Sequence, residues 1–241
     1  MIRPRPERKH IWCFLLINCI AMCAEEFGGV LFLFYRLRYK IENDTFGWLL
    51  SAWAIGSFTS QTFITPFLSL KVGLPDTIII MMGLTCNSLD VFIETLVTQV
   101  WVLFVCWGVL QMFWDCMFLM TLSAISKLVE PTEVGKFLCL VELFNKIIGV
   151  GTRPLYSLIY QATLATYPAT ALYVAIAFFQ LALALTIYTH FDIKKKERKI
   201  AREHNMETRL PLKCSEEPKN GPTGPEVGAP PPPSYDDAKR L

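Results

Sequence analysis

Four polar side chains stand at helical spacing inside a stretch of the chain that is otherwise apolar. Glu142, Asn145, Lys146 and Arg153 occur at i, i+3, i+4 and i+11, which places them on one narrow face of an α-helix. A charge at the centre of a membrane helix costs at least about 2.5–3.5 kcal/mol, so such residues face other helices or a water-filled path. The pattern predicts a helix that lines the path of a solute. Its two cations favour a solute of negative charge.

The same four residues allow a simpler interpretation. Glu142 and Lys146 have the order of a favourable i,i+4 ion pair, so they could neutralise each other and only orient the helix. Asn145 and Arg153 extend the polar face well beyond one such pair. For that reason we favour the solute path, with Glu142 holding the two cations when the solute is absent.

A second polar face lies near the start of the chain. Asn18 and Glu25 stand two helical turns apart, and Glu26 is adjacent to Glu25. Two neighbouring carboxylates inside a membrane helix are costly if both are ionised, so at least one is a candidate to hold a transferable proton. The alternative is a buried neutral carboxyl group that is hydrogen-bonded to a neighbour.

Two further polar groups occupy the middle of the chain. Gln111 and Asp115 are four residues apart and could form a cavity wall, although simple hydrogen bonds between helices would explain them as well. Asn87, Asp90 and Glu94 approach the end of their apolar segment. We therefore expect these three to be a solvated helix end.

Composition identifies the elements that position these residues. Hydrophobic residues make up 53% of the chain, charged residues 18%, and the mean hydropathy is +0.38, all typical of a membrane protein. A helix that crosses a bilayer needs about 20 mostly apolar residues. The sequence predicts six such helices in an all-α polytopic membrane domain over residues 11–190, with boundaries at 11–34, 47–70, 77–95, 99–124, 136–160 and 169–190.

The distribution of cations predicts the orientation. Lys and Arg flank the six segments mainly on the side that holds both termini, which indicates that residues 1–10 and 191–241 are cytosolic. The sequon Asn43-Asp44-Thr45 then falls in an exterior loop, so Asn43 is a predicted glycosylation site. We expect a multi-pass protein of the plasma membrane rather than of the lysosome.

Patterns typical of soluble enzymes are missing from the sequence. It has no phosphate-binding loop, no Gly-x-Ser-x-Gly and no His pair at metal-binding spacing. We therefore predict no enzymatic activity, no cofactor and no metal.

The C-terminal segment, residues 191–241, is predicted to be a disordered basic and proline-rich tail. The basic residues Lys194–Arg202 follow the last helix directly and lack interleaved aromatics, which favours contact with anionic lipid, or a flank that only fixes topology, over nucleic acid. Pro232, Pro233 and Tyr235 match the Pro-Pro-x-Tyr ligand of WW domains, such as those of ubiquitin ligases. A bare low-complexity tail is the alternative.

Several short motifs together resemble a known family. They are Arg8-Lys9-His10, Gly47 to Ala52, Ser126-Lys127-Leu128-Val129, Glu133-x-Gly135, Asn145 and Tyr160-x-Ala162-Thr163-Leu164. This combination resembles solute carrier family 46, which contains the proton-coupled folate transporter and the thymic stromal cotransporter, within the major facilitator superfamily.

The resemblance implies that the six helices correspond to the seventh through twelfth of a twelve-helix carrier. In such carriers the solute binds between two six-helix halves, so a second half would be a partner. The resemblance also implies that His10 takes part in proton coupling. We thus expect proton-coupled symport of a small organic solute. The alternative is a truncated, non-transporting membrane protein or adaptor that displays a WW-domain ligand.

Overall fold

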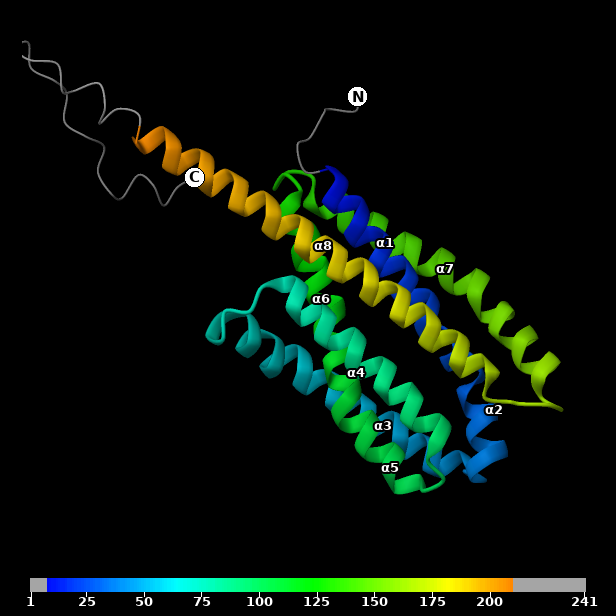
Figure 1. Cartoon of the computed structure of the whole chain (residues 1–241). Helices are drawn as coiled ribbons and strands as arrows, with labels where there is room; N and C mark the ends of the chain where they lie inside the picture. Colours follow the sequence, from blue (N-terminus) through cyan, green and yellow to red (C-terminus); the bar gives the residue numbers. More distant parts are fainter. Residues whose placement is uncertain (1–7, 210–241) are drawn as a thin grey trace, which may run out of the picture. The chain divides into compact units, whose positions relative to one another are not determined.

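The computed structural model describes residues 8–209, and every regular element in that range is a helix (Figure 1). The prediction of an all-α polytopic membrane protein is confirmed. The described residues up to Lys196 belong to one compact unit, and those from Glu197 to Arg209 belong to a second.

Within residues 8–209, six helical rods follow one another, and each matches one of the six predicted segments, two of which begin one residue before their rods. Several rods are divided into shorter helices. In chain order the elements are α1 (Arg8–Glu25), α2 (Gly28–Tyr39), α3 (Asn43–Thr59), η1 (Ser60–Ile64), η2 (Phe67–Lys71), α4 (Asp76–Leu96), α5 (Val100–Val105), η3 (Cys106–Leu110), α6 (Gln111–Leu128), α7 (Val134–Thr163) and α8 (Thr170–Arg209).

Four of these rods are long and apolar enough to cross a membrane by themselves: Lys9–Tyr39, Asp76–Leu96, Val100–Leu128 and Thr170–Lys196. The rods over residues 43–71 and 134–163 fall outside that set. The second of them contains Glu142, Lys146 and Arg153. That these two rods also cross the membrane stays a prediction.

The first rod is interrupted between α1 and α2 at Glu26 and Phe27. Gly28 and Gly29 follow, and such a glycine pair is a common cause of a sharp change in helix direction. Within a membrane, an interrupted backbone is tolerated where it is buried in protein or lines a cavity. Phe27 and Gly28 do line a cavity, which is described below.

Close helix packing holds the middle of the unit together. At Gly83 of α4, an added Cβ would lie 2.5 Å from the Met117 Cβ and 2.5 Å from the Phe113 carbonyl oxygen of α6. At Gly56 of α3 it would lie 3.2 Å from the Gly108 carbonyl oxygen. Small residues at such contacts let membrane helices approach each other closely.

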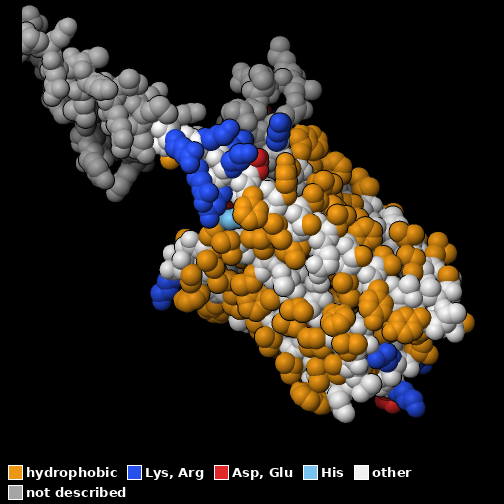
Figure 2. Space-filling view, in the orientation of Figure 1, with side chains coloured by type: hydrophobic (Ala, Val, Ile, Leu, Met, Phe, Trp, Pro, Cys, Tyr) orange, Lys and Arg blue, Asp and Glu red, His pale blue; other side chains and the backbone are white. Residues whose placement is uncertain are grey.

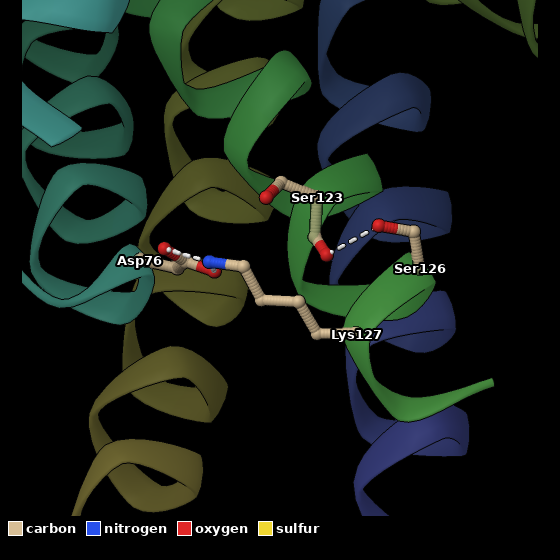
Figure 3. A network of polar contacts seen from close by, with 4 residues as sticks. All are labelled: Asp76, Ser123, Ser126 and Lys127. Carbon is tan, nitrogen blue, oxygen red and sulfur yellow. Dashed lines mark hydrogen bonds and ion pairs between the residues drawn. The ribbon is translucent and has the colours of Figure 1, made fainter. Parts of the chain in front are cut away.

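One end of α4 is tied to the end of α6 by an ion pair. Lys127 Nζ donates to both carboxylate oxygens of Asp76, at 2.9 and 2.7 Å, while Ser126 Oγ donates to the Ser123 carbonyl at 2.8 Å (Figure 3). Asp76 lies in the first turn of α4 and Lys127 in the last turn of α6, where each charge also complements its helix dipole. This contact fixes the Ser-Lys motif at a helix end predicted to be cytosolic.

The exposed apolar side chains are typical of a surface in contact with lipid. On the face shown in Figure 2, hydrophobic side chains cover most of the area and Lys and Arg lie toward its ends. Large apolar side chains are exposed on several rods, including Trp48, Ile55, Phe58 and Val150. A protein in water alone rarely exposes so much contiguous apolar surface.

The last helix is longer than predicted. α8 continues past residue 190 to Arg209, because the Lys, Glu, Arg and Ala residues there are good helix formers. Asn43 is exposed and begins α3, and its glycosylation stays a prediction. The predicted WW-domain ligand, Pro232, Pro233 and Tyr235, lies outside the described residues.

The contact at Gly83 predicts a stability effect. Gly83→Ala forces a Cβ against the α6 backbone, so we expect a loss of about 1–3 kcal/mol, measured as a lower melting temperature of the detergent-solubilised protein. Gly47→Ala is the control, because nothing lies within 4 Å of its added Cβ. Equal melting temperatures for the two variants would contradict the α4–α6 packing.

Candidate functional site

The two polar faces predicted from the sequence lie against each other. α7 packs on α1 and α2, and Asn18 Nδ2 donates to Asn145 Oδ1 at 2.7 Å between them. Both asparagines are buried, and this bond leaves Asn18 Oδ1 and Asn145 Nδ2 without a partner. One acceptor and one donor therefore remain available inside the contact for water or a solute.

An ion pair joins the same helices at the interruption of the first rod. Arg153 Nε donates to Glu26 Oε2 at 2.5 Å. Gly149 makes room for it, because a Cβ there would lie 2.6 Å from Glu26 Oε1. The Arg153 side chain is 68% exposed and that of Glu26 is 12% exposed. The pair thus lies at the edge of the α7 contact, with the arginine facing outward.

Glu142 and Lys146 do not form the ion pair that their spacing suggested. Both are exposed, and no ion pair joins them in the described structure. The expectation that Glu142 holds the cations is corrected: the carboxylate on Arg153 is Glu26, from another helix. With Arg153, these two residues form a charged border along α7, here called the α7 edge.

The neighbouring carboxylates Glu25 and Glu26 point to different helices. Asn87 Nδ2 of α4 donates to Glu25 Oε2 at 3.4 Å, whereas Glu26 pairs with Arg153 of α7. The interruption between α1 and α2 separates two groups that would otherwise repel each other along one helix. Each is therefore placed in its own polar environment.

The acidic end of α4 is buried, which corrects the expectation of a solvated helix end. Asn87, Asp90 and Glu94 are 1%, 3% and 1% exposed. Tyr35 Oη donates to Glu94 Oε1 at 2.5 Å, and Trp107 Nε1 donates to the same oxygen at 2.7 Å. These residues were expected near water because they approach the segment's end, but Tyr35 of α2 and Trp107 of η3 cover Glu94, and Asn87 meets Glu25 of α1.

A cavity of about 190 Å³ opens beside this cluster. It is lined by residues of the interrupted first rod, α3, α4, η3 and α6, among them Glu25, Asp90, Glu94, Trp53, Trp107 and Gln111. Gln111 was predicted to line a path, and it does line this cavity. Asp115, one turn further along α6, is partly buried and its Oδ2 has no hydrogen-bond partner.

His10 is separate from the other predicted proton-coupling residues. It is buried, and its Nε2 lies 3.8 Å from the Asp192 carboxylate of α8. Fifteen helical residues separate it from Glu25, a distance of about 22 Å along the rod. The structure therefore does not bring His10 and Glu25 into one site.

Sequence reasoning missed Tyr35, which is fully buried and binds Glu94. A tyrosine near the end of an apolar helix is usually an interfacial anchor, so nothing in the local pattern marks it as a partner of a carboxylate. Among the residues from 8 to 209, no group of His, Cys, Asp and Glu has the geometry to hold a metal ion.

The family model for the major facilitator superfamily matches residues 14–227, which is most of the chain. The chain belongs to the major facilitator superfamily. Proteins of this superfamily are membrane transporters, which agrees with the apolar helices and with polar groups set between them. No curated protein matches the chain significantly.

In this major facilitator protein, the Glu26–Arg153 contact predicts energetic coupling between α7 and the first rod. A double-mutant cycle of Glu26→Gln and Arg153→Met should give a coupling free energy of about 0.2–1 kcal/mol in thermal unfolding, because the Arg153 side chain is largely exposed. The same cycle on Glu142→Gln and Lys146→Met should give none, because these side chains are not paired. Coupling of equal size in both cycles would contradict the described partners.

Proposed function

We propose that the protein transports a small organic anion in symport with protons, as one six-helix half of a twelve-helix carrier. The main support for this proposal is the exposure of the charged residues that form the α7 edge. Glu142, Lys146 and Arg153 are exposed charges on a helix that also exposes large apolar side chains, including Leu143, Ile147 and Leu158.

Lipid is a poor environment for such an edge. Three charges facing hydrocarbon would each cost several kcal/mol, whereas water or a polar partner removes most of that cost. A second six-helix half, supplied by another copy or by a longer parent chain, would enclose the edge in an aqueous cavity between the halves. Once Arg153 is released from Glu26, the edge has two cations and one anion, which favours an anionic solute.

The Glu26–Arg153 pair supplies a route for proton coupling. Glu26 occupies Arg153 in the structure. An anion that displaces Glu26 would meet the guanidinium, which offers two donors in a fixed geometry. The proton that enters with the anion would then neutralise the displaced carboxylate. Glu25, held by Asn87, and His10, beside Asp192, are the further candidates for proton transfer.

The unpaired amide atoms of Asn18 and Asn145 extend this site toward the interior of the helix bundle. One acceptor and one donor lie unpaired in the contact between α1 and α7. A polar solute at the α7 edge could use both groups, and Asp115 has a free oxygen as well. We assign these residues to the solute path on that basis.

An uptake assay tests the proposal. Cells that express the chain should take up a member of a panel of radiolabelled carboxylates faster at mildly acidic than at neutral pH, because the proposed symport carries protons together with the anion. Arg153→Ala should reduce that uptake by roughly tenfold or more, while the amount of protein at the cell surface stays nearly normal.

Lys71→Met is the matched control for this assay. Lys71 is exposed at a helix end, over the Phe67 ring, and should be replaced without loss of uptake. Normal uptake by Arg153→Ala protein at the cell surface would overturn the role of the α7 edge. Equal uptake at both pH values would overturn the proton coupling.

We also propose that the C-terminal tail recruits a WW-domain protein through Pro232, Pro233 and Tyr235. In such ligands the tyrosine ring occupies a specific pocket and the prolines supply a preorganised polyproline II helix. Tyr235→Ala should abolish capture of the protein by an immobilised WW domain. Ser234→Ala is the control and should bind as the parent chain does. Equal capture of the tyrosine variant would show that the prolines alone are recognised.

A further inference from the structure

The basic run that follows the last apolar segment is helical and exposed. α8 continues as one helix to Arg209, and five of its cations stand at i, i+1, i+4, i+5 and i+8: Lys194, Lys195, Arg198, Lys199 and Arg202. Positions with this spacing share one side of a helix. All five residues are exposed. We call this set the α8 cationic face.

The α8 cationic face has no anionic partner within the described part of the chain. No salt bridge there reaches any of its five cations, and the nearby Asp192 lies against His10 instead. Residues 194–202 contain six Lys and Arg and one acid, Glu197, so their net charge is +5. The face is therefore available to a partner that carries several negative charges.

The apolar segment that can cross the membrane ends where this face begins. That segment runs from Thr170 to Lys196, and Arg202 is six residues further along the same helix. A rise of 1.5 Å per residue puts at most about 9 Å of helix between Lys196 and Arg202. Salt screens charges from each other only beyond about 8–10 Å. Every cation of the face thus lies within electrostatic reach of the membrane surface.

We propose that the α8 cationic face binds anionic phospholipid of the leaflet that surrounds this end of the apolar segment. In the predicted orientation this is the cytosolic leaflet, whose anionic headgroups attract basic segments beside a membrane helix. An acidic protein would match the charge as well, but lipid is already present at this place. Residues 194–202 contain no aromatic side chain, so they lack the stacking surface that favours nucleic acid.

This contact goes beyond the proposed transport and does not require it, because the face binds lipid rather than the solute. The same cations would also be explained as a flank that only fixes the topology during insertion. Such a flank has no further use for anionic lipid once the helix is in place. A lipid-binding face, in contrast, responds to the charge of the lipid in the mature protein.

Fluorescence quenching of the full chain in nanodiscs tests the contact. After the native cysteines are replaced, Ala201→Cys carries a fluorophore at an exposed position within the basic segment, and lipids with a nitroxide headgroup act as the quencher. Quenching should be stronger in discs of phosphatidylcholine and phosphatidylserine in equal parts than in discs of phosphatidylcholine alone. Concentrated NaCl should remove the difference, because it screens the attraction.

The triple variant Arg198→Gln, Lys199→Gln and Arg202→Gln should lose the increase that phosphatidylserine causes. Each Lys or Arg near an anionic surface strengthens the attraction by roughly fivefold, and glutamine preserves the helix. Lys71→Gln is the control and should keep the full increase, because Lys71 is an exposed cation at the end of another helix.

Equal quenching in the two kinds of disc would overturn the proposal and leave the cations as a topology flank. An increase that the triple variant retains would overturn it as well. A fluorescence change on addition of polyglutamate, with none caused by phosphatidylserine, would assign the face to an acidic protein instead. None of these measurements depends on uptake of a solute, so this proposal and the proposed transport fail independently.

Discussion

The ion pair between Glu26 and Arg153 is the contact on which the rest of the site depends. Charges are tolerated inside a membrane only where they find a partner or water, and this pair gives one of α7's charges a partner on the first rod. The interruption of that rod at Glu26 and Phe27 makes the contact possible. It also turns Glu25 toward α4, so one irregular segment positions both polar regions of the unit.

The two polar regions differ in charge and in exposure. The α7 edge carries charges of both signs and is exposed, whereas the charged residues that line the cavity beside α4 are all carboxylates. Arg153 of the edge is paired with Glu26, while no salt bridge among the described residues reaches the carboxylates of the cavity.

Sequence periodicity predicted a large part of this arrangement, since the spacing of Asn145, Arg153, Asn18 and Glu25 already placed them on single helix faces. Sequence periodicity could not identify the partner of Arg153, because Glu26 lies 127 positions away in the chain. Either Glu142 or Glu26 could balance the positive charge of Arg153. Sequence periodicity also could not predict that Asp90 and Glu94 are buried. A carboxylate near a helix end looks the same in sequence whether water or another helix covers it, and here Tyr35 and Trp107 decide the outcome.

The central claim is that the α7 edge faces water in the membrane-embedded protein. Single cysteines introduced at Glu142 and Lys146, with the native cysteines replaced, measure this directly through labelling by a membrane-impermeant thiol reagent in intact cells and in opened vesicles. Cysteines at Ile147 and Leu158, which are exposed on the apolar faces of the same helix, provide the comparison. The account predicts labelling at the first two positions and none at the other two. Equal labelling at all four positions, or labelling confined to Ile147 and Leu158, would contradict it.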